Sequence, residues 1–139
     1  MPNAVFAYSM LGAGIIPVVH KFPVATTQTL VEGDVVVLSS GQVAKASTTF
    51  GRCLGVMAQA SASAAADTLV DVWVAAPSQV WIMTADADAT TYILDSRAYD
   101  LTSAQLVATG DTSGGSISII KIGSAVTQVY VAFTACEFG

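Results

Sequence analysis

The sequence predicts an all-β fold: a small antiparallel β-barrel, β-tulip or sandwich with an extended N-terminal arm. Short β-branched or aromatic runs recur along the chain, and turn signals separate them about every eight to twelve residues, which indicates about eight or nine strands. The 139 residues suffice for one domain with a real core and are too few for two of ordinary size. We therefore expect an arm over residues 1–28 and a single β domain over residues 29–139.

Three of these runs lie close together in the first half of the chain. They occupy residues 35–38, 42–46 and 51–57, and the turns Glu-Gly-Asp and Ser-Ser-Gly precede the first and the second. The first two runs predict a β-hairpin. The third contains Gly51 and Gly55, which are placed where a bulge or a sharp corner would lie. Because no room is left for a helix, we expect a tightly coiled antiparallel sheet.

The next strands show a clear alternation of side chains. In residues 69–74 three valines face one way, whereas Trp73 faces the other way with Leu69 and Asp71, as in a half-buried strand. Residues 79–83 continue after a Pro-Ser turn and carry Trp81, so an aromatic patch is expected in the core or at an interface. Further strands are expected at residues 91–94, 104–108, 116–122 and 126–133, with a turn over residues 96–100.

The first 28 residues are apolar but keep neither a helical nor a strand period for long. Gly12, Gly14, Pro17 and Pro23 interrupt any helix. Such a segment is too apolar to remain free in water and too irregular to build its own core. We interpret it as an arm that docks onto its own domain as an edge strand, onto a neighbouring copy or onto a different protein.

The composition restricts the function classes. Hydrophobic residues make up 53% of the chain and charged residues only 11%, against about 25% in an average soluble domain. Much of the surface must be Ser, Thr, Gln, Ala and Gly, which favours association with a partner or with further copies. The net charge of −5 and the five scattered Lys and Arg residues disfavour direct nucleic-acid binding. No apolar run approaches the roughly 18 residues of a membrane span, and no secretory signal is recognisable, so we expect synthesis in the cytoplasm.

Isolated residues that could carry chemistry lack partners in the sequence. His20 is the only histidine and has no His or Cys at metal-ligand spacing, so a surface or interface position is expected. Asp86 and Asp88 resemble the start of a calcium loop, but no third acid completes it, and a solvated turn is expected. Cys53 and Cys136 are interpreted as two buried thiols in a reducing compartment, and whether they pair is left open.

Catalytic motifs are absent. The chain has no G-x-S-x-G, P-loop, H-E-x-x-H, paired C-x-x-C or nucleotide-binding glycine fingerprint. GDTSGG at residues 110–115 superficially resembles the surroundings of a serine-protease nucleophile, but the histidine base would have to come from the arm, and a β-turn is favoured. We expect no enzyme activity, no catalytic residues, no metal and no cofactor.

Four motifs together resemble one protein family. The succession E-G-D-V-V-V-L, S-G-Q-V-A-K-A, G-R-C-L-G-V-M-A and V-D-V-W-V-A-A-P is similar to the capsid cement, or head-decoration, proteins of tailed bacteriophages. The resemblance covers residues 32–77 best, and residues 99–101 and 113–115 also look like the C-terminal half of such proteins. The chain departs from the family pattern at Ser78, where a Gly commonly follows the Pro, and in its apolar arm.

This resemblance implies a compact β-barrel or β-tulip on the outer surface of the phage head, often as a trimer at local three-fold positions. It implies that the protein bridges major capsid protein subunits and stabilises the head against internal DNA pressure. The expected partners are therefore the major capsid protein and further copies of the chain, as a homotrimer or alternatively a dimer. The arm would pair with a capsid strand edge through its apolar anchors. These anchors are Phe6, Tyr8, Ile15, Ile16, Pro17 and Phe22.

Two functions of other classes remain as alternatives. A carbohydrate-binding or adhesin-like module would use Trp73, Trp81 and Tyr92 as a sugar-stacking platform, which requires the three rings to be exposed together. A hydrolase of unrecognised type is disfavoured by the shortage of histidine and of acid–base pairs.

Overall fold

The structure, a computed structural model, describes residues 4–9, 17–26, 28–47, 50–62, 65–90, 99–111 and 115–138. Within these residues β-strands form two sheets, so the expected all-β class is confirmed. The strands are β1 (Val5–Ser9), β2 (Val19–Pro23), β3 (Val35–Ser39), β4 (Gln42–Lys45), β5 (Gly55–Met57), β6 (Leu69–Val74), β7 (Gln79–Ala85), β8 (Asp100–Ser103), β9 (Leu106–Ala108), β10 (Ile117–Ile122) and β11 (Gln128–Phe133).

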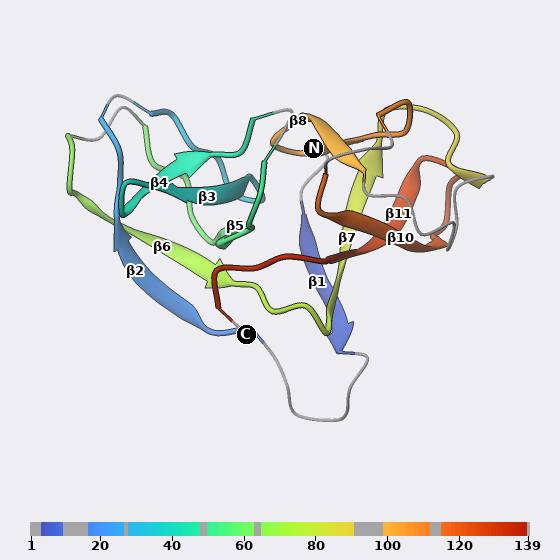
Figure 1. The fold of residues 1–139 in the computed structure, drawn as a ribbon, viewed down its shortest axis with the longest axis horizontal. Helices are drawn as coiled ribbons and strands as arrows, with labels where there is room; N and C mark the ends of the chain where they lie inside the picture. Colours follow the sequence, from blue (N-terminus) through green and yellow to red (C-terminus); the bar gives the residue numbers. More distant parts are fainter. Residues whose placement is uncertain are drawn as a thin grey trace.

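The larger sheet is built around β7. Strand β11 pairs antiparallel with one edge of β7, and β10 pairs with β11. The opposite edge is shared, because β1 pairs with the first part of β7 and β9 pairs in parallel with its last residues, Thr84 and Ala85. Strand β8 then pairs with β9. The strand order is therefore β10-β11-β7-β9-β8. Strand β1 pairs with the same edge of β7 as β9 does, at the preceding residues of β7 (Figure 1).

The smaller sheet has the order β2-β6-β5-β3-β4 and is antiparallel between all of these neighbours (Figure 1). The β3–β4 hairpin is the one expected from the sequence. Its turn places Ser40 at φ 51° and Gly41 at φ 80°. Two successive left-handed residues give the turn whose twist fits an antiparallel pair, and glycine adopts this conformation without strain. Strand β5 pairs with β3, so the expected three-stranded antiparallel arrangement is confirmed.

Both sheets curl, but neither closes into a barrel. The edges of the smaller sheet meet at one bridge, Val24 with Val43, which the Ala25 N–H supports by donating to the Val43 carbonyl at 2.9 Å. At the edges of the larger sheet, Tyr99 bridges Ile117. A barrel requires a continuous ladder between its first and last strands. The expected barrel closure is therefore not found among the described residues, because each closing contact is a single bridge.

Two clusters of buried side chains stabilise this arrangement. The larger cluster combines Trp81 and Phe133 of the larger sheet with Val35 of the smaller one. The smaller cluster, which includes Val36 and Leu54, belongs to the smaller sheet alone. Successive residues of a strand point to opposite faces, so both faces of β3 are covered. This explains why its run is continuously apolar instead of alternating with polar residues.

A buried polar contact connects the two sheets. The Asp34 carboxylate accepts hydrogen bonds from the Gln105 side chain and from the Val31 N–H, both at 2.9 Å. Next to it, the Val35 N–H donates to the Ala104 carbonyl at 2.9 Å. Asp34 and Gln105 are only 2% and 8% exposed. Because a buried carboxylate without donors is costly, these bonds restrict where the turn between β8 and β9 can lie on the smaller sheet.

Residues expected to form an arm are part of the sheets. Strand β1 pairs with β7, and β2 pairs with β6 as an edge strand of the smaller sheet. Three docking partners were considered for the arm: its own domain, a neighbouring copy and a different protein. The described residues of the arm pack against their own domain. Neither strand has a clear alternation of buried and exposed side chains. In β1 the register with β7 shifts between Phe6 and Tyr8, and β2 exposes three successive residues, Val19 to Lys21.

The C-terminal half differs from the expectation in its strand boundaries. Residues 104–105, expected inside a strand, form the turn of the β8–β9 hairpin, and β9 begins at Leu106. Strand β8 was not expected because Asp, Thr and Ser residues are typical of turns. Its pairing with β9 and the burial of Leu101 stabilise the extended conformation. The strand expected at residues 91–94 lies outside the described residues.

Gly55 is required by the close approach of β5 to β6. A Cβ atom at this position would overlap the backbone carbonyl of Trp73, which cannot move without breaking the sheet. We predict that Gly55→Ala lowers the free energy of unfolding by about 3 kcal/mol or more. Gly51→Ala is the matched control, since a Cβ there meets nothing, and it should change stability by less than about 1 kcal/mol. Urea unfolding followed by circular dichroism measures both; equal effects of the two substitutions would contradict the role of Gly55.

Candidate functional site

Exposed apolar side chains gather on one part of the surface. We define the apolar face as Val5 of β1, Val18 just before β2, Val19 of β2, Trp73 of β6, and Phe138 of the C-terminal tail, which are 38–58% exposed. Val19 and Trp73 are paired in register between β2 and β6. The others line two neighbouring pockets that share Pro17. A contiguous apolar surface of this kind is typical of an interaction site.

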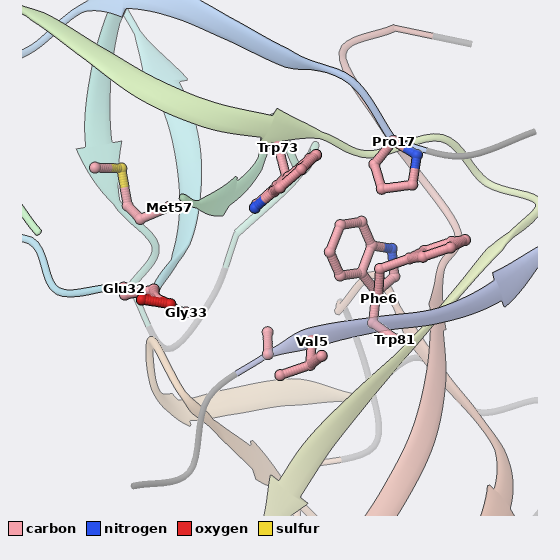
Figure 2. Close-up of a pocket in the computed structure, with 9 residues that line it drawn as sticks. Val5, Phe6, Pro17, Glu32, Gly33, Met57, Trp73 and Trp81 are labelled. Atoms are coloured by element: carbon pink, nitrogen blue, oxygen red, sulfur yellow. The ribbon is translucent and has the colours of Figure 1, made fainter. Parts of the chain in front are cut away.

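The first pocket lies where the two sheets meet and has a volume of about 380 Å³. Phe6 and Trp81 form its wall on the larger sheet, and Met57 and Trp73 form the facing wall on the smaller sheet. Figure 2 shows the Trp73 and Trp81 indole rings on adjoining parts of the pocket wall, with Glu32 at the edge across from Trp81. Its lining is mostly apolar, so it can accept an apolar side chain or ring, and the Glu32 carboxylate supplies a charged group nearby.

The second pocket, of about 500 Å³, lies on the other side of Pro17. Strand β2 and the C-terminal tail form part of it: Phe22 and Phe138 both line the pocket, and their rings stack with centroids 6.3 Å apart. His20 also lines it. The last residues of the chain therefore contribute directly to this surface, which nothing in the local sequence of the tail had indicated.

The structure brings some of the expected arm anchors together. Phe6 is half-buried, and its ring meets Trp81 edge-on at 5.6 Å. Pro17 lines both pockets and Phe22 lines the second. Tyr8 lies apart from the pockets, 6.3 Å from the Tyr130 ring and with the Lys121 ammonium 5.4 Å from its own ring centre. The anchors Ile15 and Ile16 lie outside the described residues. Binding of a partner by any of these residues stays a prediction.

The two tryptophans, expected to form one aromatic patch, have different environments. Trp73 is 38% exposed, whereas Trp81 is 1% exposed and its indole N–H has no hydrogen-bond partner among the described residues. The two rings are thus not exposed together, and Tyr92, the third member of the expected sugar platform, lies outside the described residues. The alternation of β6 did contain the signal, because Trp73 shares its face with exposed Leu69 and half-buried Asp71.

Polar groups with possible chemistry mostly serve as structural acceptors. Asp86 accepts hydrogen bonds from the Thr102 hydroxyl and from the Thr109 hydroxyl and N–H. Partial burial raises its pKa, but these bonds outweigh burial and hold the pKa of Asp86 below its usual value. Asp88 accepts from Thr90 in an exposed turn. In the part of the chain that the structure describes, no three His, Cys, Asp or Glu side chains are grouped as metal ligands, and no helix is suited to spanning a bilayer.

Asp100 is the exception to this pattern. Its side chain is 1% exposed, and its Oδ1 atom has no hydrogen-bond partner among the described residues. Burial and the neighbouring negative charge of Asp111 raise the pKa of Asp100. This carboxyl therefore holds its proton to a higher pH in the folded protein than in the unfolded chain, and its ionisation opposes folding.

The two tryptophans predict a difference in fluorescence quenching. In Trp73→Phe only the buried Trp81 remains, so acrylamide should quench its emission several-fold less than that of the wild type, with a shift of the emission to shorter wavelength. Trp81→Phe retains the exposed ring and should stay strongly quenchable. Circular dichroism checks that both variants are folded. Wild-type quenching in Trp73→Phe would contradict the assignment of Trp73 as the exposed ring.

The raised pKa of Asp100 predicts a pH-dependent effect of its removal. Below the unfolded pKa of about 3.9 the carboxyl is protonated in both states, and its destabilising effect develops as the pH rises through the folded pKa. Asp100→Asn should therefore gain in Tm relative to the wild type as the pH increases from 3 to 7. Asp88→Asn is a control of opposite sign, because hydrogen bonds from Thr90 lower the pKa of Asp88. Parallel Tm curves for wild type and Asp100→Asn would contradict the prediction.

Comparison with known proteins does not place the chain in a family. No family model matches the sequence, and no curated protein shows significant similarity to it. The assignment of function therefore depends on the residues of the chain: the apolar face, the two pockets beside it and the strand motifs of residues 32–77.

Proposed function

We propose that this protein is a structural component of a tailed-bacteriophage virion: a capsid cement protein that binds the outer surface of the head and bridges major capsid protein subunits. The observation that carries the proposal is the apolar face with its two pockets. A chain with only 11% charged residues that exposes such a face gains free energy when a partner covers it. The proposal has no need of a catalytic group.

The motifs that resemble the cement family lie on strands next to this face. They fall on β3, β4, β5 and β6, and the last of them contains Trp73. Strand β6 thus combines the family-like sequence with the most prominent aromatic group of the apolar face. In the proposed mechanism, apolar side chains of the major capsid protein enter the pockets on either side of Pro17, and the exposed edge of β2 pairs with a capsid strand.

In the proposed function, many copies of the protein bind to one head. Each copy contributes one modest interface, and the symmetry of the head multiplies it, so that many weak contacts together resist internal DNA pressure. The proposal also includes a homotrimer at local three-fold positions of the head and a tulip-like arrangement of the two curled sheets. Low charge weakens repulsion between neighbouring copies, which supports self-association.

A carbohydrate-binding module is the second candidate. The observation in its favour is the exposed Trp73 ring beside a pocket that has the Glu32 carboxylate at its edge, since sugars stack on aromatic rings and bind carboxylates through their hydroxyls. The burial of Trp81 weighs against a flat platform of several rings.

Co-sedimentation with purified, undecorated heads tests the proposed function. The wild type should bind saturably, and the double variant Val18→Ser, Trp73→Ser should bind at least about tenfold more weakly, because it removes exposed apolar contacts at both pockets. Val126→Ser is the matched control: Val126 is 48% exposed but lies outside the apolar face. It should bind like the wild type.

Two results would contradict the proposal in different ways. Failure of the folded wild type to bind the heads would reject the cement function, and a glycan array would then test the carbohydrate-binding alternative. If the double variant bound the heads as well as the wild type does, the cement function would stand, but the contact would lie outside the apolar face. Near-ultraviolet circular dichroism of both variants distinguishes lost contact from lost structure.

A further inference from the structure

Cys53 and Cys136 are far apart in the sequence but are direct partners in the fold. Cys53 precedes β5, and Cys136 lies in the tail after β11. The Cys53 N–H donates to the Ala135 carbonyl, and the Glu137 N–H donates to the Cys53 carbonyl, each at 2.9 Å. These two bonds flank Cys136, so the cysteines form an isolated parallel bridge.

A bridge of this kind brings the two Cα atoms within the range that a disulfide spans. Paired residues of adjacent strands have their side chains on the same face, and adjacent strands lie roughly 4.8 Å apart. Disulfides join Cα atoms that are roughly 4.4–6.8 Å apart. The Cys53 Sγ atom lies 3.7 Å from the Gly55 carbonyl oxygen, and the Cys136 Sγ atom lies 3.8 Å from that of Phe133. Both thiols are free, and among the described residues their hydrogen-bond contacts are with backbone carbonyl groups.

The surroundings of the thiols determine the order of reaction. Cys53 is fully buried, whereas Cys136 is half-buried and therefore accessible to a small reagent. Burial raises the pKa of Cys136 to about 11, and burial together with the nearby Cys136 raises the pKa of Cys53 well above its usual value. Few thiolates are present at neutral pH, so the reduced form persists and oxidation is slow unless the pH is raised.

The tail that carries Cys136 also completes the second pocket. Two residues further on, Phe138 stacks on Phe22 of β2 and lines this pocket. Figure 1 shows the tail leaving β11 and crossing towards β2 and β6. A covalent bond at Cys136 would therefore hold Phe138 close to β2 and preserve the pocket.

We propose that Cys53 and Cys136 are a redox-modification site that forms a reversible disulfide by exchange with a low-molecular-weight disulfide such as oxidised glutathione. The Cys136 thiolate attacks the reagent, which forms a mixed disulfide and releases one glutathione thiol. The Cys53 thiolate then displaces the second glutathione and closes the protein disulfide. The two cysteines are oxidised, the reagent is reduced to two thiols, and the two cysteine protons are transferred to them. This site does not depend on the proposed capsid function.

Oxidation of the native full-length chain tests the site. After incubation with oxidised glutathione in mildly alkaline buffer, intact mass should fall by two hydrogens, no thiol should react with maleimide after unfolding, and peptide mapping should link Cys53 to Cys136. The Tm should rise by roughly 5–15 °C and return to its original value with dithiothreitol. Amide hydrogen exchange of the tail should slow, because the bond ties it to the body of the protein.

Cys136→Ser is the control variant, because its side chain is half-buried and the substitution keeps the size of the group. It should fold with an unchanged sheet signal and show neither the mass loss nor the Tm rise. A stable mixed disulfide on Cys136 without closure would overturn the proposal, as would a disulfide only between two chains. Two thiols that remain reduced, under conditions in which a small dithiol is fully oxidised, would also overturn it.

Discussion

The hydrogen bond between the buried Asp34 carboxylate and the Gln105 side chain connects the two sheets of this protein. A charged group in the interior is stable only when donors replace its lost hydration. Asp34 has two such donors at 2.9 Å, and the Lys45 ammonium is 3.7 Å away. Around it, the backbone bond from Val35 to Ala104 adds a second connection. The sheets are thus joined at a defined place, although each has its own closing bridge.

The candidate site is a consequence of this junction. Gly33, next to Asp34, lines the first pocket, and its carbonyl accepts a bond from the Ala4 N–H just before β1. The segment that positions the sheets relative to each other also places β1, with Phe6 and Val5, opposite Trp73. The apolar surface therefore lies at the junction of the two curled sheets, where their apolar edges are not fully covered.

Both ends of the chain contribute to the same surface. Val5 and Val18 come from the N-terminal segment, and Phe138 comes from the C-terminal tail. The tail is held by the backbone bonds around Cys53 and by the stack of Phe138 on Phe22. Terminal segments are usually the least stable parts of a domain unless sheet pairing or packing restrains them. In this protein the residues that hold the terminal segments in place also form the apolar surface, so the order of these segments and the shape of the surface are linked.

The all-β class, the hairpin at Ser40 and Gly41, the presence of strands β3 to β7 and the separation of Trp73 from the buried valines of β6 could be predicted from the amino-acid sequence. These features depend on local turn chemistry and on the alternation of side chains, which are readable within a few residues. Long-range contacts in the folded chain set four other features: the pairing of β1 with β7, the strand conformation of β8, the open curl in place of a barrel and the bridge between Cys53 and Cys136. Each of these depends on which distant edge is available for pairing, and this long-range complementarity leaves no periodic signal in the sequence.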